Sequence, residues 1–157
     1  MKKLMLFVSI LFALTSNTFS QVHQQQNRMV RITSPINNST VEQEGNTVEF
    51  STSTTPALGA SLVVFVRDPN GRYWPYVGPD HDNNRWTMQN VQYGVAQDHS
   101  RNFEITVIIL SDILIRNGMQ YHGATVYIEN NTPITQGGFN FLLNRYTHSQ
   151  TVITRRD

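Results

Sequence analysis

The sequence predicts an all-β domain, an antiparallel β-sandwich of about seven to eight strands. From residue 29 onward, short runs rich in Val, Ile, Phe, Thr and Tyr alternate with clusters of Asn, Gly, Pro, Asp and Ser. No long amphipathic helix pattern interrupts this rhythm. Because the turn clusters recur at short intervals, the runs between them fit strands, and a series of such strands is typical of two packed sheets.

Two-residue alternation indicates the first strands. Residues 30–32 alternate and end at the turn residues Ser34-Pro35. In residues 47–54, Val48 and Phe50 lie on one face and polar residues on the other. A period of two places one face against a core and the other in water, so both runs read as half-buried strands.

The next two runs predict a hairpin. Residues 61–67 (SLVVFVR) are apolar on both faces, which predicts a central position in a sheet. Residues 68–71 (DPNG) follow with strong turn chemistry, since Gly71 tolerates positive φ. Residues 72–77 would return as the partner strand. Pro75 lacks a backbone donor, so this strand should lie at an edge or contain a bulge.

The second half of the domain continues the pattern. Residues 85–93 alternate and then slip register by one residue, which predicts a β-bulge. Residues 102–110 (NFEITVIIL) are the clearest strand of the chain. Further strands are expected at 125–129 and 150–155, and a short helical turn at 113–116; residues 132–148 could be a strand or a helical turn.

The stretch ITSPINNSTVEQEGNTVEFSTST, within residues 30–54, resembles the start of bacterial extracellular immunoglobulin-like and fibronectin-III-like modules. Such modules often begin with a strand, a Ser-Pro, an Asn/Gly-rich turn and a second strand that ends in small polar residues. The resemblance implies an immunoglobulin-like β-sandwich outside the cytoplasm, with no fixed catalytic residues. The segments 107–115 and 129–149 are richer than a minimal module of this kind requires.

The N-terminus has the three parts of a cleavable signal peptide. Lys2 and Lys3 precede an apolar run, and Thr18 and Ser20 supply the small residues at a cleavage site. The predicted organisation is a signal peptide at 1–20, a flexible polar leader at 21–28 and a single immunoglobulin-like domain at 29–157. We therefore expect an exported protein, periplasmic or extracellular, with no membrane span.

Composition excludes several classes of function. The chain has no cysteine, so it has neither a disulfide nor a zinc–thiolate site. Its lysines both lie in the predicted signal peptide, and the remaining basic residues are balanced by acidic ones. Nucleic-acid binding requires a concentrated basic face, so we expect no nucleic-acid partner.

The stretch 68–86 is the strongest candidate for a ligand site. Tyr73, Trp74 and Tyr76 are aromatic residues of the kind on which sugar rings pack, and Asp80, Asp82 and Asn84 could bind hydroxyl groups. Neighbouring residues of a strand point to opposite faces, so one of Tyr73 and Trp74 should be in the core and the other exposed. Trp86 alternates with Met88 and is expected to be buried.

Asp80, Asp82 and Asn84 also have the opening spacing of a calcium loop, but that pattern is incomplete. Arg85 stands where the loop requires glycine, and Val91 stands where it requires a bidentate glutamate. We therefore expect no metal and no cofactor. A polar loop whose side chains bond to their own backbone is the preferred interpretation.

No pattern of catalytic residues is recognisable, and we expect a protein that is not an enzyme. The five histidines are scattered, and neither a nucleophile elbow nor a glycine-rich phosphate loop is present. The leading hypothesis is a non-catalytic interaction module that binds a protein or another cell-envelope component. The alternative is a glycan-binding module that uses the aromatics of residues 72–86.

Overall fold

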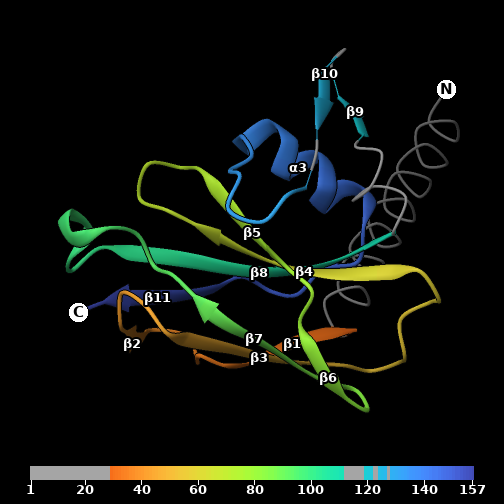
Figure 1. The fold of residues 1–157 in the computed structure, drawn as a ribbon, viewed down its shortest axis with the longest axis horizontal. Coiled ribbons are helices and arrows are strands. Elements are labelled where there is room, and N and C mark those ends of the chain that lie inside the picture. The colour runs from red at the N-terminus through yellow and green to blue at the C-terminus, as the bar shows by residue number, and fades with distance from the viewer. Residues whose placement is uncertain (1–28, 112–118, 122–123, 127) are drawn as a thin grey trace, which may run out of the picture.

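The computed structural model describes residues 29–111, 119–121, 124–126 and 128–157. Most of these residues form two β-sheets packed face to face, with helix α3 on the outer face of the five-stranded sheet (Figure 1). The prediction of a β-sandwich is confirmed at this level. The predicted signal peptide (1–20), polar leader (21–28) and helical turn (113–116) lie outside the described residues.

The smaller sheet is antiparallel and has four strands in the order β1-β3-β7-β6. Its strands are β1 (Val30–Ser34), β3 (Asn46–Thr52), β7 (Arg85–Val91) and β6 (Asp80–Asp82). Val48 and Phe50 of β3 are buried, whereas Thr47 and Glu49 are exposed. The predicted alternation is therefore confirmed: the apolar face of β3 lies in the core and the polar face is in solvent.

The register slip predicted within residues 85–93 is a β-bulge. Val48 of β3 pairs with Met88 of β7, and Asn46 pairs with Val91, so β7 carries one extra residue between these pairs. Asn90 takes the positive φ of 57° at this point. The extra residue lets both Met88 and Val91 enter the core, although their spacing would otherwise place them on opposite faces.

The larger sheet has five strands in the order β2-β11-β8-β4-β5. Its strands are β2 (Ser39–Val41), β11 (Val152–Arg156), β8 (Asn102–Ser111), β4 (Ala60–Arg67) and β5 (Tyr73–Val77). As predicted, β4 lies centrally, between β5 and β8, and β5 with Pro75 is at the edge. The predicted antiparallel pairing has one exception among the described strands, because β2 pairs with β11 in parallel.

The main core lies between the two sheets. Its buried side chains alternate along the strands of both sheets, as expected for aligned sandwich layers. They are Val30, Val41, Val48, Phe50, Leu62, Val64, Val66, Tyr76, Met88, Val91, Tyr93, Phe103, Ile105 and Val107.

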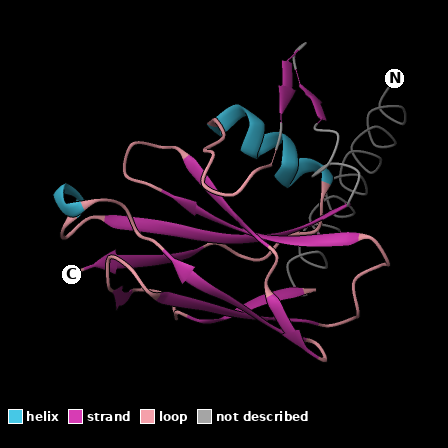
Figure 2. Ribbon diagram, viewed as in Figure 1, coloured by secondary structure: helices cyan, strands magenta, loops and turns pink. Residues whose placement is uncertain are grey.

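Helix α3 (Gln136–Arg145) covers the opposite face of the larger sheet and creates a second core (Figure 2). Thr135 caps its start, because its hydroxyl accepts a hydrogen bond from the backbone N–H of Gly138. The second core consists of Val63, Phe65, Tyr73, Ile108, Leu110, Ile128, Ile134, Phe139 and Leu142. β4 and β8 are therefore apolar on both faces because each face meets a different layer.

The domain contains more strands than the seven to eight that were predicted. Among the described residues, eleven strand segments are present, including a separate hairpin of β9 (Met119–Tyr121) and β10 (Ala124–Val126). The strands β2, β6 and β9 escaped prediction because three residues are too few to show alternation. In the part of the chain that the structure describes, no helix has the length and apolarity needed to cross a membrane.

Tyr93 carries a buried polar group in the main core that lacks a hydrogen-bond partner in the described part of the chain, and its replacement tests what this costs. Its side chain is fully buried, and its hydroxyl has no hydrogen-bond partner among the described residues. Burial raises the pKa of this phenol, so the hydroxyl stays neutral. Because an unpaired buried hydroxyl carries a desolvation cost, we expect Tyr93→Phe to raise the unfolding free energy by about 1 kcal/mol in urea denaturation.

Tyr76→Phe is the matched control for this prediction. The Tyr76 hydroxyl donates to the carbonyl of Gln92 at 3.0 Å and accepts from its backbone N–H at 3.1 Å. Loss of these bonds should lower the unfolding free energy by about 1 kcal/mol. Equal destabilisation by both substitutions would contradict the assignment of Tyr93 as unpaired.

Candidate functional site

Tyr73 and Trp74 point to opposite faces of β5, as their adjacent positions predict. Tyr73 is only 5% exposed and stacks on Phe139 of helix α3, with 3.8 Å between ring centroids. Its hydroxyl donates to Oε1 of Gln136 at 2.8 Å. Tyr73 is therefore a core residue that holds the helix, and it is not available to a ligand.

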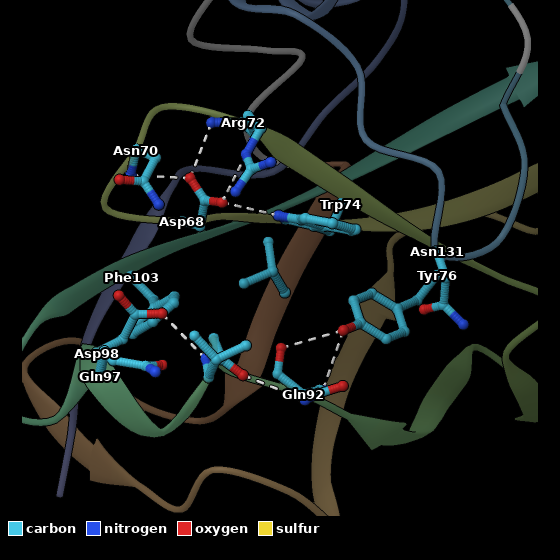
Figure 3. Close-up of a pocket in the computed structure, with 13 residues that line it drawn as sticks. Asp68, Asn70, Arg72, Trp74, Tyr76, Gln92, Gln97, Asp98, Phe103 and Asn131 are labelled. Atoms are coloured by element: carbon cyan, nitrogen blue, oxygen red, sulfur yellow. Dashed lines mark hydrogen bonds and ion pairs between the residues drawn. The ribbon is translucent and has the colours of Figure 1, made fainter.

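Trp74 and Tyr76 lie on the other face of β5 and line a cavity of about 420 Å³. This volume falls within the range of roughly 300–1,000 Å³ found for small-molecule sites. Figure 3 shows their side chains around a common space that Gln92 and Phe103 border from across it. The lining residues are Val66, Asp68, Asn70, Arg72, Trp74, Tyr76, Gln92, Gly94, Val95, Gln97, Asp98, Phe103 and Asn131.

The β4–β5 turn builds one wall of the cavity around the buried carboxylate of Asp68. Its Oδ1 accepts from the backbone N–H groups of Asn70 at 2.9 Å and Arg72 at 3.0 Å. Its Oδ2 accepts from the indole Nε1 of Trp74 at 3.0 Å and from Nε of Arg72 at 3.2 Å. The turn predicted from DPNG is thus confirmed, and its aspartate fixes the orientation of the indole as well (Figure 3).

Asp68 is held in its ionised form. Burial alone would raise its pKa, but hydrogen bonds from Trp74 and Arg72, together with the charge of Arg72, outweigh burial and hold the pKa below its ordinary value of 3.8. A lowered pKa in the folded state contributes stability above that ordinary value, and this stability is lost as the pH falls through the folded-state pKa.

We therefore expect acid-dependent loosening of this wall. Between pH 5 and pH 2, wild-type protein should lose stability more steeply than Asp68→Asn, which has no carboxylate to protonate. At pH 7 the substitution should itself cost about 2 kcal/mol, because an amide has one acceptor oxygen and its NH2 group would face donors where the second carboxylate oxygen accepts. Urea denaturation at a series of pH values measures both effects. Parallel pH profiles for the two proteins would show that Asp68 does not carry the acid sensitivity.

Residues 92–98 form the opposite wall, which bends sharply at Gly94. Gly94 has φ +72°, and a Cβ there would lie 2.7 Å from Cζ of Phe103 and closer still to the carboxylate of Asp98. The short 3-10 helix η1 (Ala96–Asp98) follows, and Oδ2 of Asp98 accepts from the backbone N–H of Val95 at 3.0 Å. Only glycine allows Asp98 and Phe103 to approach the backbone so closely.

Arg156 of β11 fastens this second wall to the larger sheet. Its side chain is 3% exposed, although arginine is rarely buried. Its guanidinium donates to the backbone carbonyls of Tyr93 at 3.4 Å, of Ala96 at 3.1 Å and of Val95. The flat guanidinium with several donors suits this arrangement, because it can serve carbonyls that diverge around the bend.

The remaining predicted site residues lie elsewhere. Asp80, Asp82 and Asn84 are exposed on β6 and the turn before β7, in the smaller sheet. Asp82 accepts from the side chain of Asn83 at 2.9 Å, and Asn84 from the hydroxyl of Thr55 at 3.4 Å. None of the three lines the Trp74 cavity, although Asp80 and Tyr76 border a separate hollow. Within the described residues, no group of His, Asp and Glu side chains could hold a metal ion.

Trp86 is half-buried rather than fully buried. Its ring stacks on Phe50 with centroids 6.4 Å apart and on His81 with centroids 4.9 Å apart. Its indole Nε1 donates to the hydroxyl of Thr52 at 3.3 Å. Trp86 packs against the main core and does not line the Trp74 cavity. The two tryptophans of the chain therefore lie in different environments, and only Trp74 can sense a ligand in that cavity.

The structure therefore keeps two of the predicted site residues, Trp74 and Tyr76, together and adds others from distant segments. Gln92, Gln97, Asp98, Phe103 and Asn131 were not predicted. The isolated glycine at position 94, directly after buried Tyr93, was the one signal of a close backbone approach in this region. No family model matches the chain, and no curated protein matches its sequence.

Proposed function

We propose that the protein is an exported, non-catalytic binding module with an immunoglobulin-like fold. Its partner would be a protein or another component of a bacterial cell envelope, met in the periplasm or outside the cell. The signal-like N-terminus and the resemblance of residues 30–54 support export and the fold type. The observation that carries the binding role is the Trp74 cavity, with an apolar floor and a polar rim.

The floor and the rim have different functions in this proposal. Half-buried Trp74 provides aromatic surface that a ligand can cover, and the buried side chains of Tyr76 and Phe103 form the apolar floor behind it. Asn70, Gln97 and Asn131 are exposed at the rim and could orient that ligand by hydrogen bonds. A few placed polar groups around an apolar floor are the usual composition of a binding site.

The state of the two carboxylates in the cavity supports a role without catalysis. A glycosidase pair requires one acid with a raised pKa that can donate a proton. Asp68 has a lowered pKa and accepts hydrogen bonds on both oxygens. Asp98 uses Oδ2 to hold the backbone of Val95. Both carboxylates serve to shape the walls.

Co-sedimentation of residues 21–157 with isolated cell envelopes of the producing bacterium tests this function. We expect wild-type protein to sediment with the envelopes and Trp74→Ala to bind about 30-fold more weakly, as truncation of a central aromatic residue usually costs about 2 kcal/mol. Trp86→Phe is the matched control, because Trp86 lies outside the cavity.

Gln97→Ala separates binding from folding in the same assay. Gln97 is exposed, and no hydrogen bond of its side chain is seen within the described part of the chain, so its loss should leave stability unchanged. Weaker sedimentation of this variant supports the proposal. Sedimentation that is equal for wild type, Trp74→Ala and Gln97→Ala would refute the cavity as the binding site.

A further inference from the structure

We infer that the group recognised in the Trp74 cavity is a saccharide without anionic groups. This inference rests on the proposed binding function of the same cavity. It depends on three properties of the lining: the aromatic surface, the pairing of the charged side chains, and the amide side chains for which no hydrogen bond is seen within the described residues.

The aromatic surface is that of Trp74, which is half-buried: it packs in part against the main core and also lines the cavity. The guanidinium carbon of Arg72 lies 5.4 Å from the indole centroid, over the ring. In Figure 3, Arg72 lies on one side of the indole, and Gln92 lies across the cavity on the other side. The electron-rich face of an aromatic ring attracts weakly positive hydrogens, and the C–H groups on one side of a sugar ring present such hydrogens.

The indole is also held rigidly before any ligand arrives. Asp68 accepts from its Nε1, and Arg72 bonds to the same carboxylate oxygen. The ring therefore loses little conformational entropy on binding, which favours a weakly held ligand such as a sugar.

The charges in the lining disfavour an anionic ligand. Arg72 is the one cationic side chain among the described lining residues, and it is paired with the ionised Asp68. Asp98 adds a carboxylate to the opposite wall. A phosphate, sulfate or uronate would meet excess negative charge and a cation that is already neutralised.

The rim supplies neutral hydrogen-bonding groups in place of charges. Asn70, Gln97 and Asn131 lie on three separate segments around the cavity, and within the described residues no hydrogen bond of their side chains is seen. Each amide offers two donors and one acceptor oxygen, which matches a hydroxyl that both donates and accepts. Hydroxyl groups on a ring that stacks on Trp74 would face such a rim.

Fluorescence of a single-tryptophan variant can measure saccharide binding at Trp74 directly. The chain has two tryptophans, so Trp86→Phe leaves Trp74 as the sole indole, at the cavity. We propose to titrate this variant with neutral oligosaccharides chosen from a glycan array, and with uronate and sulfated counterparts of the same size. We expect a shift of the Trp74 emission and saturable binding for a neutral oligosaccharide only.

Rim variants in the same background test the hydrogen-bonding groups. Gln97→Ala and Asn131→Ala should each weaken binding about fivefold to tenfold, the contribution of one hydrogen bond. Asn144→Ala, an exposed residue of helix α3 outside the cavity, is the control and should leave binding unchanged. Rim variants that bind the neutral oligosaccharide as tightly as their parent would overturn the inference.

The two proposals fail in different ways. If charged saccharides bind more tightly than neutral ones, or no saccharide on the array binds, the saccharide inference is wrong. If envelopes treated with periodate, which cleaves the vicinal diols of sugars, still bind the protein through Trp74, the partner is a different component and only the general binding function stands. If untreated envelopes show no Trp74-dependent binding, the proposed function itself is wrong.

Discussion

Replacing Phe139 with alanine is expected to lower the unfolding free energy by about 4 kcal/mol, because it empties the centre of the second core. Phe139 is 4% exposed, stacks on Tyr73 and meets Phe65 edge-on with centroids 5.4 Å apart. It joins helix α3 to both β4 and β5. Guanidinium denaturation monitored by circular dichroism measures the loss.

Asn144→Ala on the exposed side of the same helix is the control, with an expected change within about 0.5 kcal/mol. A Phe139→Ala protein that unfolds like Asn144→Ala would mean that helix α3 does not form a layer of the folded domain. An intermediate loss of about 1 kcal/mol would mean that neighbouring side chains close the cavity that the substitution leaves.

Replacing Arg156 with alanine is expected to lower the unfolding free energy by about 3 kcal/mol, because several charged hydrogen bonds are lost while the desolvation cost of the buried guanidinium is removed as well. The carbonyls of Tyr93, Val95 and Ala96 would lose their shared donor. The wall that contains Gly94 and Asp98 would be held less firmly to β11, through the backbone hydrogen bonds of Ser100 and Arg101 to residue 156. Ligand binding should therefore fall together with stability.

Arg156→Lys separates charge from geometry. An ammonium group has the same charge but cannot spread its donors over three diverging carbonyls in the way that a guanidinium does. We expect lysine to recover less than half of the lost stability. Full recovery by lysine in thermal or urea denaturation would show that the charge at this position matters more than the fork of donors.

Much of the sandwich could be predicted from local patterns. Alternation placed β3 and β8, DPNG placed the β4–β5 turn, and the slip between Met88 and Val91 gave the bulge in β7. Helix α3 could not be assigned, because Gly137 and Gly138 lower helix propensity at its start. The spacing of Phe139, Leu142, Leu143 and Tyr146 nevertheless has the helical period.

The candidate site was less predictable than the fold. Trp74 and Tyr76 could be chosen because aromatic residues beside a turn are visible in the sequence. Asp98 and Asn131 come from segments that only the folded sheets bring to β5, and no local pattern reports such proximity. Tyr73 was wrongly predicted to be a ligand-binding residue, because the helix whose Phe139 stacks on it was not foreseen.

The parallel pairing of β2 with β11 has a consequence for how the polypeptide reaches this fold. β2 and β11 are far apart in the sequence, and they must meet before the larger sheet is complete. β11 must also insert between β2 and β8. Such high contact order slows folding. Until β11 docks, the long strand β8 presents an unpaired edge, so the partly folded polypeptide is vulnerable to aggregation and to proteases before this pairing forms.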